Sequence, residues 1–350
     1  MSWDVIGQER AVAVLRRAVE DPSRRSHAYL FAGPEHVGRA ITARRFAQAL
    51  NCTADADRPC GACRTCRLIA EDKHPDVEWV GEGGVCDESD HRHSPADGAR
   101  DIRICQVRRL ERVVSRTTVD ARCRVIVVDP ADTLTAEAAN AFLKTLEEPV
   151  PITVLLLITA REEALRETVR SRCRRIVFYG VPRDDVEAAL RERWGASPEQ
   201  AARLARLAQG RLGWAVLALG DERLLIERER TMDEIEALLE GGYGERFSYA
   251  ASLGARYSRQ PQTVQASLDL WSAWWRDVLL AAAGQESLAA EAERLDTLRS
   301  HAAQYGVGDA VRALVALMDA RRHLEEHASP TLALEAMLLE LPQPRAGRRR

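Results

Sequence analysis

Short apolar runs alternate with amphipathic segments over the first half of the chain. The apolar runs are strand-sized and occupy 27–32, 74–79, 124–129, 152–159 and 176–178. Between them, apolar residues recur at helical spacing over 10–19, 41–50, 102–116 and 135–148. Continuous apolar strands separated by helices are typical of a parallel sheet that is covered on both faces. We therefore predict a doubly wound α/β domain whose functional site lies at the carboxyl ends of the strands.

From Arg183 onwards the pattern changes to helical segments that are rich in Ala, Leu and Arg. Helices are expected at 184–194, at 198–208 and after Gly210, and the remaining chain is helical in character as well. We predict an α/β domain over 1–180, a small helical lid domain over 181–220, a helical domain over 221–343 and a basic tail over 344–350. The predicted fold class is therefore α/β plus all-α.

Charge and composition exclude several classes of protein. The 50 basic and 53 acidic residues give a net charge of -3, so any contact with nucleic acid must be local. No apolar run approaches the ~20 residues of a membrane helix, and the N-terminus lacks the basic and apolar regions of a signal peptide. We expect a cytoplasmic protein with no membrane partner, in which the eight cysteines are thiols and some hold a metal.

A glycine-bounded loop follows the first predicted strand. Gly33 and Gly38 match the phosphate-loop pattern G-x-x-x-x-G-K-[ST], in which backbone N–H groups and a helix N-terminus face an anion. The lysine position holds Arg39 and the hydroxyl position holds Ala40. The ammonium for the β- and γ-phosphates and the hydroxyl for Mg²⁺ are thus both absent, and a planar guanidinium is not a direct replacement. This degenerate loop predicts weak or no nucleotide binding, and a simple turn is the alternative.

A second altered motif ends the strand at 124–129. Asp129 stands where an acid holds Mg²⁺ in a Walker B element. The following position, which in active ATPases is a glutamate that activates water, is Pro130. Two independent losses predict a domain that does not hydrolyse ATP. The competing interpretation is an active ATPase in which Arg39 substitutes for lysine.

Four cysteines follow the helix predicted at 41–50. Cys52, Cys60, Cys63 and Cys66 form the pattern Cys-x₇-Cys-x₂-Cys-x₂-Cys. Four thiolates within fifteen residues suit tetrahedral Zn²⁺, and four sulfur ligands leave no open coordination position for chemistry. We predict a structural zinc site. The alternatives are an iron–sulfur cluster and free reactive thiols.

Two arginine features stand out in the sequence, a stripe on one predicted helix and a single arginine between two apolar runs. Arg108, Arg112 and Arg116 lie at i, i+4 and i+8 on one face of the predicted helix, which suggests contact with phosphates, either of DNA or of a neighbour's nucleotide. The alternative is a solvated basic face. Arg172 lies in the triplet Ser171-Arg172-Cys173 between two apolar runs, and a solvated basic turn is the alternative there.

With these residues placed, the chain resembles the clamp-loader family of AAA+ proteins. The resemblance rests on Val5-Ile-Gly-Gln8, Gly33-Pro34…Gly38, the four cysteines, Asn140-Ala-Phe-Leu-Lys-Thr-Leu-Glu-Glu-Pro149 and Thr168-Val-Arg-Ser-Arg-Cys173. It covers residues 1–220 by motif and the remainder by helical character and size. Because the phosphate-loop lysine and hydroxyl are lost, the chain resembles a non-hydrolysing subunit of the bacterial DNA polymerase III loader rather than its gamma/tau ATPase. The segment 81–98 and the basic tail have no role that the resemblance assigns.

The resemblance implies a mechanism and a set of partners. In this family five subunits form an open ring on a C-terminal helical collar, here 221–343, and the ring loads a sliding clamp onto primed DNA. The implied partners are gamma/tau and delta subunits in a hetero-pentamer, the sliding clamp, and primer-template DNA through the complex. ATP is bound at the neighbouring subunit, and Arg172 is implied to act on it in trans as a catalytic arginine finger. The cofactor implied for this chain itself is structural Zn²⁺.

Overall fold

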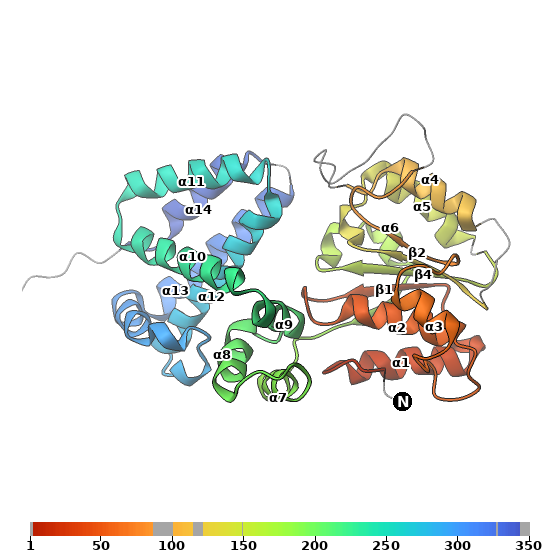
Figure 1. The fold of residues 1–350 in the computed structure, drawn as a ribbon. Helices are drawn as coiled ribbons and strands as arrows, with labels where there is room; N and C mark the ends of the chain where they lie inside the picture. Colours follow the sequence, from red (N-terminus) through yellow and green to blue (C-terminus); the bar gives the residue numbers. More distant parts are fainter. Residues whose placement is uncertain (1–2, 87–100, 115–121, 149, 327, 344–350) are drawn as a thin grey trace, which may run out of the picture. The chain divides into compact units, whose positions relative to one another are not determined.

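The computed structural model describes residues 3–86, 101–114, 122–148, 150–326 and 328–343. The chain divides into two compact units, one of 1–194 with 210–214 and one of 195–209 with 215–350. Figure 1 shows a sheet with helices on both faces in the first unit and helices in the second. This arrangement confirms the predicted fold class, α/β plus all-α, and the boundaries of the three predicted domains stay a prediction.

A five-stranded parallel sheet forms the centre of the first unit. Its strands are β1 (Ala28–Ala32), β2 (Val77–Val80), β3 (Arg124–Val128), β4 (Thr153–Thr159) and β5 (Arg174–Val177). Their order across the sheet is β2-β3-β4-β1-β5, and every neighbouring pair is parallel. In register, Leu30 of β1 stands opposite Leu157 of β4 and Arg175 of β5. The carboxyl ends of β1, β3 and β4 therefore meet at one edge of the sheet, where the loops that follow them come together.

Helices cover both faces of this sheet. On one face lie α1 (Glu9–Glu20), α2 (Arg39–Asn51) and α3 (Arg64–Ala70), and on the other α4 (Ile104–Val114), α5 (Ala136–Glu147) and α6 (Glu167–Arg170) (Figure 1). Successive residues of β1 point to opposite faces, so Tyr29 packs against Phe46 of α2 while Leu30 belongs to the core cluster that contains Phe142 of α5. Both β1 and β3 are buried along their whole length, which explains their continuous apolar sequence.

Local signals set where the helices begin. The Thr135 hydroxyl accepts a hydrogen bond from the backbone N–H of Ala138 at 3.2 Å and caps α5. A hydroxyl at this position satisfies one of the donors that the first turn of a helix leaves unpaired. The capped helix carries Leu146 and Glu147 to the neighbourhood of α6 and β5, where one of the predicted functional residues lies.

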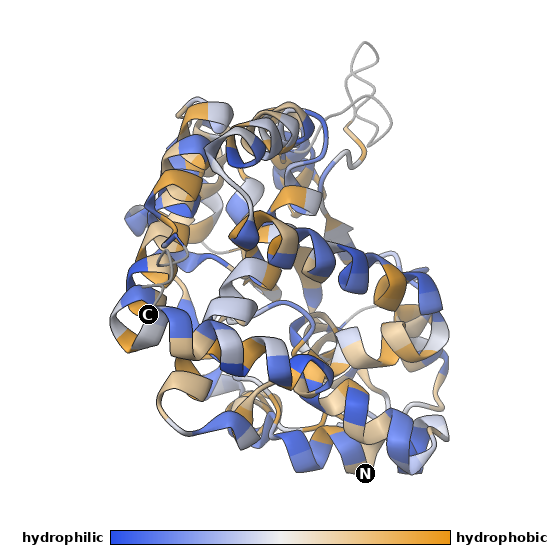
Figure 2. Ribbon diagram, turned by 90° about the vertical axis from the view of Figure 1, so that its left-hand side faces the viewer, coloured by the Kyte–Doolittle hydropathy of each residue, from blue (hydrophilic) through white to orange (hydrophobic). Residues whose placement is uncertain are grey.

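The second unit is helical. After α7 (Arg183–Trp194) of the first unit, the chain forms α8 (Pro198–Ala208), α9 (Leu212–Gly220), α10 (Glu222–Glu240), α11 (Tyr243–Tyr257), α12 (Pro261–Ala282), α13 (Leu295–Glu325) and α14 (Pro330–Glu340). Trp271, Trp274 and Trp275 of α12 are fully buried in its core. Hydrophobic and hydrophilic residues are interleaved along these helices (Figure 2), as expected when each buries one face. Among the described helices, none has the length and apolar character to cross a membrane.

An apolar stripe lies on the surface of α13. Gly306 has a φ of 71° and interrupts this helix. Beyond the interruption, residues at i, i+4, i+8 and i+11 are apolar and 44–69% exposed: Val307, Val311, Val315 and Met318. Side chains at this spacing share one face of a helix. We call these four residues the α13 stripe.

Candidate functional site

The loop between β1 and α2 requires both of the glycines that its sequence pattern contains. Gly33 has a φ of 152°, and a Cβ there would collide with the carbonyl oxygen of Phe178. Gly38 has a φ of 102° and precedes the first residue of α2 without a side-chain cap. Only glycine adopts such backbone angles without strain. The loop therefore keeps the backbone form of a phosphate loop although its chemical residues differ.

Arg39 carries its positive charge into this loop. It is the first residue of α2, and burial lowers the pKa of its guanidinium, against the attraction of Asp129, Glu35 and Asp132. Burial likewise raises the pKa of Asp129, and the nearby Arg39 opposes that rise. Among the described residues, Nη1 of Arg39 has no hydrogen-bond partner. The predicted residues Gly33, Gly38, Arg39 and Asp129 are thus brought together, and the cation and the acid at this edge act on one another.

A second carboxylate at the same edge was missed by the sequence reasoning. Asp132 lies in the 3-10 turn η3 (Ala131–Thr133) after β3 and is buried. It accepts a hydrogen bond from the Thr159 hydroxyl at 2.7 Å, and Arg161 pairs with it through Nη2 at 2.7 Å and Nε at 3.0 Å. Thr159 ends β4, so the polar end of that strand is already committed to Asp132. The polarity of Thr159 at the end of an apolar run was the signal for this site that the sequence contained.

The phosphate loop also contacts residues 212–214, which begin α9 and belong to the first unit. The backbone N–H of Gly213 donates to the carbonyl oxygen of His36 at 2.8 Å. A Cβ at Gly213 would lie 3.0 Å from that oxygen, so the close approach favours glycine. Burial lowers the pKa of His36, and Arg211 and Arg39 lower it further against the opposing Glu35. Nothing in the local sequence signalled this contact, because its two partners lie far apart along the chain.

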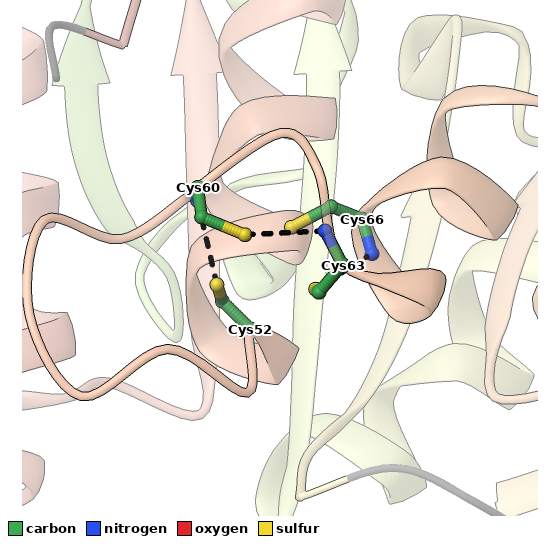
Figure 3. A group of neighbouring side chains, drawn as sticks. All are labelled: Cys52, Cys60, Cys63 and Cys66. Atoms are coloured by element: carbon green, nitrogen blue, oxygen red, sulfur yellow. Dashed lines mark hydrogen bonds between the residues drawn. The ribbon is translucent and has the colours of Figure 1, made fainter.

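The four cysteines converge as their spacing predicts (Figure 3). Cys52 follows α2, Cys63 caps α3, Cys66 lies within α3, and Cys60 lies in the connecting loop. Their four Sγ atoms all lie within 4.8 Å of one another. A tetrahedron with Zn–S bonds of about 2.3 Å has sulfur–sulfur edges of about 3.8 Å, so a small contraction would complete such a site.

Backbone hydrogen bonds favour the thiolate form in this cluster. The N–H groups of Cys60, Cys63 and Cys66 each donate to the Sγ of the preceding cysteine, at 3.4, 3.3 and 3.4 Å. Burial raises the pKa of the Cys63 thiol, but hydrogen bonds from Thr53 and Cys66 outweigh it and bring that pKa to about 6. Burial raises the pKa of Cys66, which is fully buried. A divalent cation is the partner that would stabilise all four as thiolates.

Arg172 lies between strands β4 and β5, as the apolar runs suggest, in the turn that joins the short helix α6 to β5. Its Nη1 donates to the carbonyl oxygen of Thr168 at 2.8 Å, and its Nη2 pairs with Oε1 of Glu147 at 2.6 Å. The side chains of Arg172 and Glu147 are 34% and 50% exposed. An exposed pair of this kind contributes about 0–1 kcal/mol. The guanidinium is therefore oriented at the surface by contacts that another anion can replace at low cost.

The remaining predicted residues are only partly described. Arg108 and Arg112 lie on the exposed surface of α4. Arg116, the basic tail 344–350 and residues 87–98 of the predicted surface loop lie outside the described residues.

Comparisons with known proteins agree on one family. The family model described as "DNA polymerase III, delta subunit" matches residues 7–181. The DNA polymerase III subunit delta' of Bacillus subtilis is 26% identical over 345 residues, which are 98% of this chain and 99% of that protein. The subunit delta' of Pseudomonas aeruginosa is 36% identical over 152 residues, 43% of this chain and 42% of that protein. The subunit gamma/tau of Mycobacterium tuberculosis H37Rv is 32% identical over 188 residues, 53% of this chain and 30% of that protein.

Two solved structures are similar at a low level. The match to a DNA polymerase III gamma subunit-related protein of Thermotoga maritima spans 94% of this chain and 97% of that protein's chain, with a TM-score of 0.37 and 17% identity. The match to the DNA clamp loader delta protein of Bacillus subtilis spans 95% of this chain and 99% of that protein's chain, with a TM-score of 0.35 and 13% identity. The family assignment rests on the sequence comparisons and not on these likenesses.

The cysteine cluster predicts a metal content that can be measured directly. We expect the purified chain to contain about one zinc per molecule by elemental analysis. Cys63→Ser removes one of four ligands and should bring the zinc content close to zero. Cys86→Ser, which alters a cysteine outside the cluster, should leave it unchanged. Iron in place of zinc, or metal-free protein, would refute the assignment.

Proposed function

Because the chain belongs to the DNA polymerase III delta-subunit family, with delta' subunits among its relatives, we propose that it is a non-hydrolysing clamp-loader subunit that helps to load the sliding clamp onto primed DNA. Its proposed partners are gamma/tau and delta subunits, the clamp, and primer-template DNA through the complex. Its proposed role is to lend Arg172 to the ATP of a neighbouring gamma/tau subunit. The observation that carries this proposal is the guanidinium of Arg172, oriented at the surface by Thr168 and Glu147, in a unit whose phosphate loop lacks the lysine and the hydroxyl.

Several contacts support the absence of ATP hydrolysis by this chain. Productive hydrolysis needs a lysine and a hydroxyl on the loop and an acid free to hold Mg²⁺. Here the first two are Arg39 and Ala40, and Arg39 acts electrostatically on Asp129. Pro130 provides no carboxylate to activate water. The loop's own carbonyl at His36 is bonded to α9.

The surroundings of Arg172 support its role as a finger. A trans finger must be held in one orientation and yet be able to reach a neighbour's phosphate. The Thr168 carbonyl fixes one nitrogen of the guanidinium, and the replaceable Glu147 carboxylate occupies the other. A γ-phosphate carries more charge than a carboxylate and could accept from Nη2 of Arg172 in place of Glu147. Exchange of one anion for the other would stabilise the charge of the transferring phosphoryl group.

We propose that the second unit contributes to the oligomeric collar through the α13 stripe. Four exposed apolar side chains in line on one helix are more than a surface helix needs, and such faces mark contact sites between proteins. The proposed occupant is a helix of another clamp-loader subunit. The cysteine cluster, by contrast, would hold Zn²⁺ as a structural ion between α2 and α3 and take part in no reaction.

The second candidate function is an ATP-hydrolysing gamma/tau-like subunit with an atypical phosphate loop. It is favoured by the 32% identity to gamma/tau over 188 residues and by the preserved backbone form at Gly33 and Gly38. In that case Arg39 would contact the nucleotide instead of compensating Asp129.

Binding of labelled ATP to the isolated chain separates the two functions. We expect no saturable binding at micromolar ATP, because the loop has Arg39 in place of the lysine and Ala40 in place of the hydroxyl that would hold Mg²⁺. A gamma/tau subunit measured under the same conditions provides the positive control. Micromolar affinity for ATP accompanied by turnover would establish the ATP-hydrolysing function and refute the non-hydrolysing one.

Arg172→Ala in a reconstituted clamp loader tests the finger. We expect the variant to assemble normally, while hydrolysis at the adjacent ATP site falls by about 10³-fold or more. Arg172→Lys keeps the charge but not the planar fork and should recover only part of the rate. The readout is ATPase activity stimulated by DNA and clamp.

Two variants control this experiment. Arg175→Ala removes an exposed arginine that pairs with Glu162 and should leave the ATPase unchanged. Val311→Asp places a charge in the α13 stripe and should prevent assembly, so that a loss of subunits is told apart from a loss of catalysis. Wild-type ATPase activity in an assembled Arg172→Ala complex would disprove the finger role.

We further propose that Arg108 and Arg112 contact DNA phosphates within the complex. Each phosphate contact adds about 0.9 to the slope of log affinity against log salt. The double substitution to Ala should therefore lower the magnitude of that slope by about 1.8. The double substitution of Arg183 and Arg191, exposed arginines of α7, serves as the matched control. An unchanged slope in the α4 variant would mean that its arginines form only a solvated face.

A further inference from the structure

Three arginines from separate segments meet at the edge of the sheet opposite to the phosphate loop. Arg17 lies in the last turn of α1, Arg24 ends the 3-10 turn η1 (Pro22–Arg24), and Arg174 begins β5. Together with Val14 they line a cavity of about 260 Å³. We call it the arginine cavity. It lies at the amino ends of the strands, because η1 precedes β1 and Arg174 is the first residue of β5. The phosphate loop follows the carboxyl end of β1, so the two sites are distinct.

Hydrogen bonds hold two of these arginines in place. Nη1 of Arg174 donates to the backbone carbonyl oxygen of Arg24 at 3.1 Å, which ties β5 to η1. Nε of Arg24 pairs with Oδ2 of Asp21 at 3.1 Å. Asp21 is itself fixed by Ser23, whose backbone N–H and hydroxyl donate to Oδ1 at 3.0 and 2.6 Å. The wall of the cavity is therefore built by the turn that connects α1 to β1, and not by freely moving side chains alone.

The charges that line the cavity do not balance. The three guanidinium groups that line the cavity contribute +3, and Asp21, which pairs with Arg24 but does not line the cavity, contributes −1, which leaves +2 (3 − 1 = 2). Within the described residues, neither Arg17 nor Arg174 forms an ion pair. Like charges that converge on one small cavity repel each other, and an anion between them would remove that repulsion. A ligand of charge near −2 would complete the site.

The chemistry of the lining selects a phosphate monoester among such anions. A monoester carries about −1.5 to −2 at pH 7 and offers three strong acceptor oxygens, whereas a phosphodiester carries a single charge. Guanidinium forks bind these oxygens in pairs. The volume is below the about 300–1,000 Å³ of ordinary small-molecule pockets, which fits one phosphoryl group with an adjoining sugar. Val14 supplies an apolar surface for that sugar.

We propose that the arginine cavity binds a terminal phosphate monoester, carried either by the 5′ end of a nucleic acid strand or by a free nucleotide. The proposal does not rest on the clamp-loader function, since the site uses none of the residues assigned to that function. Both sources present the same group to the three arginines. They differ in whether additional strand contributes to the affinity.

Calorimetric titration of the full chain at low salt tests the proposal. The ligands are inorganic phosphate, a nucleoside 5′-monophosphate, a 5′-phosphorylated oligonucleotide and the same oligonucleotide with a 5′-hydroxyl. We expect the phosphorylated ligands to bind, and the double variant Arg17→Ala/Arg174→Ala to weaken their binding at least tenfold. Arg16→Ala, an exposed neighbour on α1 that does not line the cavity, should bind as the wild type does. Thermal unfolding of each variant checks that the fold is retained.

The outcomes of the titration distinguish the two sources of the phosphate monoester and can also refute the proposal. If the phosphorylated oligonucleotide binds more than tenfold tighter than the monophosphate, the ligand is a strand end, and similar affinities indicate a free nucleotide. The proposal is overturned if no phosphate monoester binds at millimolar concentration. It is also overturned if the 5′-hydroxyl oligonucleotide binds as tightly as its phosphorylated twin, or if Arg16→Ala loses as much affinity as the double variant.

Discussion

Burial of the parallel sheet on both faces is the constraint on which the rest of the first unit depends. A strand covered by helices on either side has no position along its length where a charged side chain is tolerated without a partner. Polar chemistry is therefore confined to the two ends of the strands. At the carboxyl ends lie Arg39, Asp129 and Asp132, and at the amino ends lie the residues of the arginine cavity. The same physical rule produces both groups, although they differ in how their charge is compensated.

At the carboxyl edge the compensation is internal. Asp132 is satisfied by Thr159 and Arg161, and Asp129 shares its field with Arg39. A Mg²⁺ ion would have to displace Thr159 and Arg161 before Asp132 could hold it. The arginine of the α6–β5 turn shows the reverse arrangement, because its carboxylate partner is half exposed and replaceable. One unit thus combines a phosphate loop without the lysine and the hydroxyl with an exposed, oriented guanidinium, and this contrast is what the proposed function uses.

Features that depend on local sequence could be predicted, and those that depend on distant contacts could not. The strands, the helices and the cap at Thr135 are encoded by hydrophobic period and by single capping residues, and the structure contains them. The cysteine cluster was predictable because its spacing already brings the thiols close together. By contrast, the bond between Gly213 and His36 joins residues 177 positions apart (213 − 36 = 177), and no periodicity encodes it. The pairing of Arg172 with Glu147 is of the same kind. Sequence alone identified the arginine but not what holds it.

The α13 stripe has a consequence for the amount of this chain that a cell can tolerate. Until another surface covers them, Val307, Val311, Val315 and Met318 remain in water. Exposed apolar faces of this kind promote self-association and mark a protein for chaperones and proteases. Copies made in excess of their partners would therefore be lost to aggregation or degradation. The amount of this chain that persists would thus be set by the amount of the partner that covers the α13 stripe. An excess of the chain over that partner would be removed without a dedicated regulator.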